Sequence, residues 1–522
     1  MGIITLNGND LTIEDVVKVA RNDYKVKLSK EAIDNIQKSR ALVDKFVKED
    51  KVSYGITTGF GRFSDIVISK DDAKELQRNL IISHSCGVGN PLDEEIVRAI
   101  MLLRINALSK GYSGIRLQTL EVLISMVNEG VHPIIPEKGS LGASGDLAPL
   151  SHMVLTMIGE GEAIYKGERL PSKEAMKKAN IDILEDLSYK EGLALINGTQ
   201  VMTAIGLLTL YDSINLLKHA DIALALTMEG LNGISCAMDE KVHRVRPHKG
   251  QINTAKNILN IVKDSEMTTK QGEIRVQDAY SLRCSPQIHG ASKDAIEYVK
   301  NKVNIEINSV TDNPIIFPNQ EEVISGGNFH GQPMALAFDF LSIALAEIAN
   351  ISERRLEKLV NPAINHNLPA FLVNKGGLNS GFMIVQYSAA SLVSENKVLA
   401  HPASVDSIPS SANQEDHVSM GTIAARKARE IMKNTRKVLS MEILGAVQAI
   451  DLRENNNLGV GSKAAYKVVR DNIPFVDKDR IMYKDIDKCE DIIISNLIID
   501  KVEEAIEEDI LVNEEIPEVS FI

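Results

Sequence analysis

Tryptophan is absent from the 522 residues, and aromatic residues of all kinds make up only 4% of the chain, as 11 Phe and 11 Tyr. The core must therefore be built mainly from aliphatic side chains. With so few tyrosines, each one in a glycine-rich or polar segment is a candidate for a chemical role. The hydrophobic share of 44% and the charged share of 25% are those of an ordinary globular protein, which excludes a largely disordered chain.

Cysteine and positive charge are also scarce. The four cysteines form no C-x-x-C pair, and their wide spacing fits a reduced compartment better than a disulfide framework. Lys and Arg number 58 against 71 Asp and Glu, for a net charge of −13. Because binding of nucleic acid needs clustered positive charge, we expect no nucleic-acid partner.

Long apolar runs and a signal sequence are missing as well. The most apolar stretch, residues 200–231, is interrupted by Asp212, Lys218 and Asp221, whereas a membrane span needs about 18 consecutive apolar residues. The N-terminus has acidic residues where a signal peptide has basic residues and an apolar run. We therefore expect a cytoplasmic protein with no membrane partner.

Helical periodicity dominates the rest of the sequence. Apolar residues recur at three- and four-residue steps over residues 332–360 and 415–452, which predicts two helices much longer than is usual in globular proteins. Strands are expected only at residues 241–246 and 315–317. The pattern predicts a mainly α fold, a long-helix bundle with few short strands.

Glycine and proline gather in four short segments between the helical stretches. In a helical protein such irregular segments are where function is expected. The segments are residues 54–61, 139–149, 192–198 and 325–331. The sequence has no βαβ alternation, so GFGRF at residues 59–63 and NLGVGSK at residues 457–463 are not dinucleotide-binding loops.

The most informative segment is GSLGASGDLAPL, residues 139–150. Asp146 is a good helix N-cap, and Pro149 falls where a first helical turn tolerates proline, so we expect Asp146 to cap a helix that runs through His152. Capping does not explain why Ala-Ser-Gly stands between further glycines.

Ala143, Ser144 and Gly145 have the chemistry for a backbone cyclisation. The amide nitrogen of Gly145 is unhindered, so it can bend back onto the Ala143 carbonyl carbon. Loss of water closes a five-membered ring. A second dehydration, across the Ser144 side chain, leaves an exocyclic methylidene, an electrophile that no encoded side chain supplies.

The whole segment resembles the signature of the aromatic amino acid ammonia-lyases, a family that includes histidine, phenylalanine and tyrosine ammonia-lyases and related aminomutases. In that family Ala-Ser-Gly becomes 4-methylidene-imidazol-5-one (MIO). The resemblance implies a lyase whose MIO forms autocatalytically from Ala143, Ser144 and Gly145, without a metal or a dissociable cofactor. It also implies a homotetramer whose sites are built from several subunits.

Two further motifs are similar to those of the family. YGITTGFG at residues 54–61 resembles a segment whose tyrosine takes the β-proton, which implies that role for Tyr54, although Thr57 stands where histidine ammonia-lyases usually have Asn. The motif QDAYSLRCSPQ begins at Gln277, a substrate-binding position by resemblance. In it Tyr280 would help proton transfer and Arg283 would bind the substrate carboxylate, for which a planar guanidinium is well suited.

Single positions complete the site that the resemblance implies. Asn197 matches the asparagine that orients the MIO carbonyl, and Asn328 and Phe329 match a segment that lines the site. Ser-His at His84 and NQEDH around Glu415 are similar to histidine ammonia-lyases. A carboxylate accepts a charge-assisted hydrogen bond from an imidazole N–H, whereas opposite a phenyl ring it would be buried without a partner.

The resemblance thus implies that L-histidine is converted to trans-urocanate and ammonia. Two alternatives stay open: a tyrosine or phenylalanine ammonia-lyase or aminomutase with the same cofactor, and a non-catalytic helical scaffold.

No metal is expected, because the spacing of His243 and His248 hardly suits one helical metal site. We expect an N-terminal MIO-bearing catalytic region at residues 1–200 and a central long-helix bundle with C-terminal helices at residues 201–522.

Replacing Ser144 tests the electrophile directly. We expect Ser144→Ala to abolish activity and leave the fold intact, because the methylidene carbon comes from the serine side chain. Mass spectrometry of the peptide around Ser144 should show the loss of two waters in the unchanged protein. A loop that keeps both waters would refute the mechanism.

Overall fold

The computed structural model describes residues 2–49, 51, 53, 55–56, 58–59, 68–69 and 72–515. The chain forms two compact units, and neither is a single continuous stretch of sequence. Unit 1 comprises Met1–Leu208, Lys300–Asp339 and Pro402–Arg426. Unit 2 comprises Thr209–Val299, Phe340–His401 and Lys427–Ile522.

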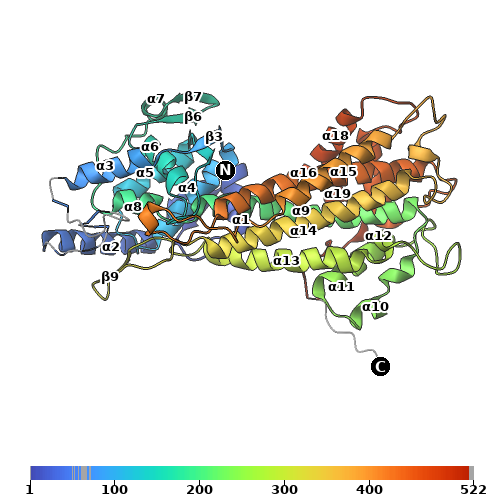
Figure 1. Cartoon of the computed structure of the whole chain (residues 1–522), viewed down its shortest axis with the longest axis horizontal. Helices are drawn as coiled ribbons and strands as arrows, with labels where there is room; N and C mark the ends of the chain where they lie inside the picture. Colours follow the sequence, from blue (N-terminus) through green and yellow to red (C-terminus); the bar gives the residue numbers. More distant parts are fainter. Residues whose placement is uncertain are drawn as a thin grey trace. The chain divides into compact units, whose positions relative to one another are not determined.

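Unit 1 is made of short and medium helices with small sheets between them (Figure 1). Its first helix begins as capping rules predict, since the Thr12 hydroxyl accepts a hydrogen bond of 3.1 Å from the Asp15 N–H. The helices that lie wholly in this unit are α1 (Ile13–Arg21), α2 (Lys30–Lys48), α3 (Ala73–His84), α4 (Glu94–Ser109), α5 (Leu117–Glu129), α6 (Leu147–Met157), α7 (Ser172–Lys178), α8 (Glu191–Ile196) and the 3-10 turn η4 (Ser411–Asn413).

The strands of unit 1 are three or four residues long and pair locally. β1 and β2 are parallel, β3 pairs with β5, β4–β6–β7 form an antiparallel sheet, and β8 pairs with β9. Their bounds are β1 (Ile3–Leu6), β2 (Lys25–Leu28), β3 (Val88–Pro91), β4 (Val131–Pro133), β5 (Pro136–Lys138), β6 (Glu162–Tyr165), β7 (Glu168–Pro171), β8 (Ile315–Phe317) and β9 (Glu322–Ile324). The expected strand at residues 315–317 is confirmed.

Unit 2 is built on a bundle of four long helices that also contribute residues to unit 1. They are α9 (Gln200–Gly230), α13 (Ser285–Glu306), α14 (Gln332–Val360) and α16 (Gly421–Asp451), and Figure 1 shows them running side by side. The other elements of unit 2 are η2 (Ser235–Met238), α10 (Glu240–Arg244), α11 (Lys249–Ile261), α12 (Tyr280–Arg283), η3 (Ala370–Leu372), α15 (Met383–Leu399), α17 (Val460–Asn472), α18 (Met482–Ile494) and α19 (Leu497–Ile506).

The mainly α fold with long helices and few short strands is confirmed. Two local predictions are wrong. Residues 241–246 do not form a strand: the Asp239 carboxylate caps α10 by accepting from the Lys241 N–H at 2.9 Å, and the apolar side chains Val242 and Val245 are exposed rather than buried. The helix expected from residue 415 begins at Gly421, because Met420 has a positive φ of 54°.

The core of the unit 2 bundle encloses a fully buried network of charges. The Arg355 guanidinium (α14) binds both oxygens of Glu442 (α16), and its Nη1 donates to His289 Nε2 (α13) at 3.1 Å. Since arginine can only donate, His289 carries its proton on Nδ1 and donates it to Asp221 (α9) at 2.8 Å. Lys293 pairs with the other oxygen of Asp221 at 2.6 Å. The network therefore links all four long helices through two ion pairs and the hydrogen bonds of His289.

The helix α14 is long and apolar enough to cross a membrane by length and composition alone, the one such helix in the described part of the chain. In its most apolar window 67% of the residues are buried inside the protein, as in the core helix of a bundle.

The four cysteines are free thiols, and Cys489 is buried.

Removing one partner of the buried network should be costly. We expect Arg355→Leu to lower the free energy of unfolding by about 3–5 kcal/mol, because the buried Glu442 carboxylate loses its counter-charge. The matched control is Lys467→Leu, which removes an exposed ion pair with Asp471 and should cost at most about 1 kcal/mol. The urea midpoints of the two variants measure the difference, and equal midpoints would contradict the role assigned to the network.

Candidate active site

The Ala-Ser-Gly loop, defined here as residues 139–146, joins β5 to α6 in unit 1. Gly142 and Gly145 form an isolated antiparallel bridge, so Ala143 and Ser144 are the two residues of a tight turn. Ser144 has a φ of 53°, a left-handed conformation that is costly for a residue with a side chain. The chain is thus folded sharply back on itself at the three residues proposed to cyclise.

A second segment lies directly against this turn. Gly198 bridges Gly145, its N–H donates to the Ser144 carbonyl at 3.3 Å, and its own carbonyl accepts from the Asp146 N–H at 2.7 Å. A Cβ on Gly145 would lie 2.2 Å from the Gly198 carbonyl oxygen, so a side chain at this position cannot be accommodated. The close approach of the two backbones requires glycine.

The carboxylate of Asp146 fixes the loop from within the core. It is fully buried, and its Oδ2 accepts hydrogen bonds from the N–H groups of Val201 and Met202 at 3.0 and 2.9 Å. Its Oδ1 accepts from the hydroxyls of Ser140, at 2.9 Å, and Thr422. Burial raises the pKa of the Asp146 carboxyl above its ordinary value, and these donors lower it in turn.

The expected helix cap is therefore corrected. Asp146 does stand at the N-cap position of α6, but its side chain makes no capping hydrogen bond there. It caps the N-terminus of α9 instead, because the buried N–H groups at the start of α9 are the donors within its reach. A helix distant in sequence is thus bound to the loop.

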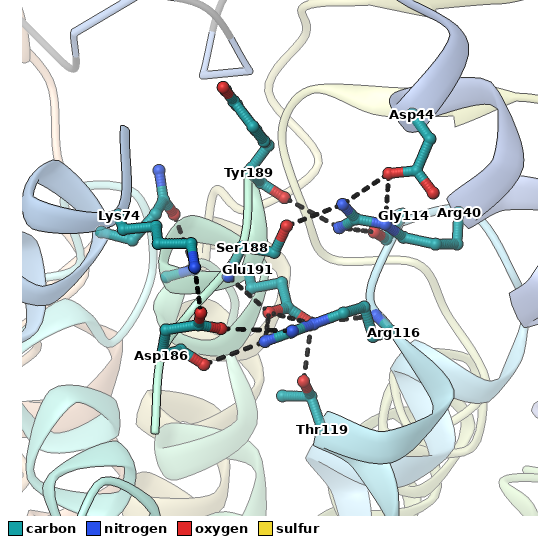
Figure 2. A network of polar contacts seen from close by, with 12 residues as sticks. Arg40, Asp44, Lys74, Gly114, Arg116, Thr119, Asp186, Ser188, Tyr189 and Glu191 are labelled. Atoms are coloured by element: carbon teal, nitrogen blue, oxygen red, sulfur yellow. Dashed lines mark hydrogen bonds and ion pairs between the residues drawn. The ribbon is translucent and has the colours of Figure 1, made fainter. Parts of the chain in front are cut away.

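Asn197 stands at the C-terminal end of α8, and the opposite end of that helix is held by a polar network. The buried Glu191 carboxylate accepts from the Arg116 side chain at 2.9 Å, from the Thr119 hydroxyl at 2.7 Å and from the Ser188 N–H at 2.7 Å. Figure 2 shows the Arg116 and Thr119 side chains and the Ser188 main chain converging on Glu191. With only six residues, α8 depends on such contacts more than on its own hydrogen bonds.

Two further segments of unit 1 pack on the loop. The Met420 N–H donates to the Leu141 carbonyl at 3.0 Å, and a Cβ on Gly142 would lie 2.2 Å from Ser419 Oγ. The segment that contains Glu415 therefore contacts the Ala-Ser-Gly loop four and five residues further along. The rings of His330 and His417 stack at 5.6 Å, which joins this segment to the one that carries Asn328 and Phe329.

The individual side chains in these segments have few partners. Asn328 is exposed and donates to the Val310 carbonyl at 3.3 Å, and Phe329 is half-buried. The Glu415 side chain is half-buried, and its Oε2 is buried without a hydrogen-bond partner in the described chain. An unpaired buried carboxylate oxygen is costly, and this oxygen can accept a further hydrogen bond.

His84 is the last residue of α3 and is half-buried, with its Nδ1 3.0 Å from the Ser83 hydroxyl. Burial lowers the pKa of the His84 imidazole below its ordinary value, which favours the neutral ring. The chain after it leads into β3, which pairs with β5 just before the Ala-Ser-Gly loop. The Gly87 N–H also donates to His152 Nε2 on α6 at 3.1 Å.

Three predicted site residues belong to unit 2. Gln277 is exposed, Tyr280 is 68% exposed, and the Arg283 guanidinium lies 4.6 Å from the centre of the Tyr280 ring. Arg283 Nε donates to the Asp278 carbonyl at 2.9 Å. Tyr54 and Thr57 lie outside the described residues.

The structure also reveals polar residues behind the loop that sequence reasoning missed. Arg104 on α4 donates through Nη1 to the Asn197 carbonyl at 2.7 Å, and Lys190 pairs with Asp312 at 2.7 Å. Asn197 Nδ2 donates to the Asn313 carbonyl at 2.9 Å. A signal for Arg104 exists in the sequence, since it is a lone charge in the otherwise apolar run of residues 99–105.

The residues present fit a cyclised tripeptide. The tight turn at Ser144, the absence of room for a side chain on Gly145 and the buried Asn197 Oδ1, which has no described partner, suit a group made from the backbone itself. Within the described residues no group of three or more His, Cys, Asp or Glu side chains could hold a metal ion.

Comparisons with known proteins agree with this arrangement. The family model for aromatic amino acid lyases matches residues 11–471. The chain is 66% identical to histidine ammonia-lyase from Alkaliphilus oremlandii (strain OhILAs), and the match covers 97% of this chain and 99% of that protein. It is 62% identical to histidine ammonia-lyase from Caldanaerobacter subterraneus subsp. tengcongensis (strain DSM 15242 / JCM 11007 / NBRC 100824 / MB4), and the match covers 97% of this chain and 98% of that protein. The chain belongs to the aromatic amino acid lyase family.

Solved structures show the same fold. Histidine ammonia-lyase from Trypanosoma cruzi matches with a TM-score of 0.90 at 40% identity, covering 100% of both chains. Tyrosine aminomutase from Streptomyces globisporus matches with a TM-score of 0.92 at 38% identity, covering 96% of this chain and 98% of that one. The backbone alone therefore does not distinguish a lyase from an aminomutase.

Loss of the Asp146 carboxylate should loosen the start of α9. We expect Asp146→Ala to lower the free energy of unfolding by about 2–4 kcal/mol, because the buried N–H groups of Val201 and Met202 lose their acceptor. Hydrogen exchange at these two amides should speed up in step. Asp146→Asn keeps an acceptor oxygen of the same reach, so its free energy of unfolding should fall less than that of Asp146→Ala. An equal fall in both variants would contradict the capping role.

Proposed function

We propose that the chain catalyses the non-oxidative deamination of L-histidine to trans-urocanate and ammonia, as a histidine ammonia-lyase of histidine degradation. The observation that carries the proposal is the tight Ala-Ser-Gly turn held by Gly198 and Asp146, in a chain 66% identical to a histidine ammonia-lyase. Identity favours this substrate over the aminomutases, which match at 38% or less.

The electrophile of the reaction would be MIO, formed from Ala143, Ser144 and Gly145. Once formed, it supplies an exocyclic carbon that accepts the substrate amine and makes the amine a leaving group. The residues of the chain hold it in place: the Gly198 N–H lies on the Ser144 carbonyl, and Asn197 stands beside it with an unpaired side-chain oxygen. The N-terminus of α6, just after the loop, favours negative charge there.

The imidazole of the substrate would be bound by His84 and Glu415. The Glu415 Oε2 that has no described partner can accept a hydrogen bond from an imidazole N–H, which offsets the cost of burying it. A phenyl ring offers no hydrogen-bond donor at this position. Glu415 is therefore the residue that favours histidine over phenylalanine.

The remaining roles fall on exposed or half-buried residues. Arg283 would bind the substrate carboxylate through its guanidinium, with Gln277 nearby in sequence. Tyr54 would take the β-proton and Tyr280 would assist proton transfer, while Asn328 and Phe329 would line the site. These roles rest on the motifs that carry each residue.

Self-association as a homotetramer would complete the site. Gln277 and Tyr280 are exposed to a degree unusual for substrate-binding residues. A neighbouring copy that covers them would exclude water from the reaction, as buried charge chemistry requires. We place the enzyme in the cytoplasm, with an amino acid as its small-molecule partner, and the N-terminal 200 residues as its MIO-bearing region.

The competing activities differ in their products. A tyrosine or phenylalanine ammonia-lyase would release coumarate or cinnamate, an aminomutase would return a β-amino acid, and a helical scaffold would release nothing. We expect incubation with L-histidine to give urocanate and ammonia in equal amounts, and incubation with L-tyrosine or L-phenylalanine to give no product above background.

Absorbance and ammonia assays on the same panel measure this, with the Ser144→Ala protein as the matched blank. Coumarate formed without urocanate would reject histidine as the substrate. No product from any amino acid, together with an unmodified loop, would favour the scaffold.

A further inference from the structure

Arg104 is a fully buried arginine that contacts the segment packed against the Ala-Ser-Gly loop. Its Nη1 donates to the Asn197 carbonyl and to Gln200 Oε1, each at 2.7 Å. Its Nε and Nη2 have no hydrogen-bond partner in the described chain. Each unpaired buried donor costs about 1–3 kcal/mol, so a residue kept at this cost calls for a functional explanation.

One peptide group links Arg104 to the electrophile. The carbonyl of Asn197 and the N–H of Gly198 belong to the same peptide unit, and that N–H donates to the Ser144 carbonyl at 3.3 Å. A charged donor on the carbonyl oxygen polarises the peptide and makes its N–H a stronger donor. The contacts therefore form a chain from the guanidinium through the peptide to the Ser144 carbonyl.

The geometry of Gly198 makes this chain possible. A Cβ on Gly198 would lie 2.4 Å from Gln200 Oε1 and 2.6 Å from Arg104 Nη1, so a side chain at this position would displace both groups. The guanidinium can therefore approach the peptide only because residue 198 is glycine. On its other side Gly198 lies against Gly145. The Gly198 backbone is therefore in contact with the Arg104 guanidinium on one side and with the loop backbone on the other.

Arg104 carries a positive charge that can polarise the Asn197–Gly198 peptide. Burial lowers the pKa of Arg104 to about 10, so the guanidinium is still protonated at neutral pH. Asp312 is the carboxylate whose charge acts on it, and that carboxylate is already paired with Lys190 at 2.7 Å.

We propose that Arg104 is a positioning residue of the reaction, which acts through the Asn197–Gly198 peptide on the Ser144 carbonyl. In the cyclised loop that carbonyl is conjugated with the carbon that accepts the amine. A stronger donor on the carbonyl oxygen withdraws electrons from that carbon and so makes it a better electrophile. The inference rests on the proposed function, because it requires that the loop is cyclised.

The test compares two buried arginines on the same helix. Arg98 also lies on α4 and donates to main-chain carbonyls, those of Val19 at 2.8 Å and Val127 at 3.2 Å, but none of its contacts reaches the loop. Arg104→Met should lower kcat about 10–100-fold and change KM for histidine less than about threefold. Arg98→Met should leave kcat unchanged. Arg104→Lys keeps a cation and should recover most of the loss.

Two readouts separate reactivity from folding and from loop formation. Mass spectrometry should find the loop peptide of Arg104→Met short of two waters, as in the unchanged protein. With carbonyl-13C serine, the Ser144 carbonyl resonance should move upfield in Arg104→Met, because its hydrogen bond is weaker, and stay in place in Arg98→Met. If Arg104→Met does not fold, the same comparison is made with Arg104→Lys, which should show a smaller shift in the same direction.

Several results would overturn the inference. They are an unchanged kcat in Arg104→Met, a rise in KM alone, an unmoved Ser144 resonance, or a loop that keeps its two waters in the variant only. A loop that keeps its waters in the unchanged protein would instead reject the proposed function itself. The two failures are therefore distinguishable.

Discussion

The buried carboxylate of Asp146 is the interaction on which the candidate site depends. One side chain accepts from the start of α9, from the loop and from the start of α16, so three segments far apart in sequence meet at two oxygen atoms. Burying a carboxylate is costly, and the four donors offset part of that cost, since the pKa of the Asp146 carboxyl stays raised. The position of Ser144 is in turn fixed by the neighbour of Asp146 in the chain, Gly145, and by Gly198 on its far side. The reactive turn is held by its surroundings rather than by its own conformational preference.

Much of the architecture could be predicted from the sequence because helices and glycine-rich loops leave patterns over short stretches of residues. The periodicity of residues 332–360 gave the bounds of α14, and the glycine-rich segment at 139–149 marked the loop. The failures have local causes as well. Residues 241–246 have the apolar spacing of a strand, yet Asp239 caps a helix there and the apolar side chains remain exposed. The late start of α16 depends on Met420, whose N–H is bound by Leu141, a contact that no short pattern reveals.

The residues around the loop also show that sequence patterns do not reveal contacts between distant segments. Ala143, Ser144, Gly145 and Asn197 could be named from motifs, and the structure shows by which contacts the tripeptide and the segment of Asn197 adjoin. Arg104 and the Lys190–Asp312 pair could not be named with a role, because their importance lies in distances between α4, α8 and the segment before β8. Spacing along the chain carries no information about a guanidinium that meets a peptide bond more than ninety residues away. Such supporting residues become visible only in three dimensions.

The reach of the Asp146 contacts has a consequence for the order of events during biosynthesis. Thr422, one of its donors, and Met420, which binds Leu141, follow most of the chain. A ribosome has therefore translated four fifths of the message before the turn at Ser144 can be clamped in its final form. A nascent chain that ends before these residues lacks both contacts, so the turn cannot yet be held as it is in the folded protein. The clamped form of the turn therefore depends on the chain that follows the loop, as far as Thr422.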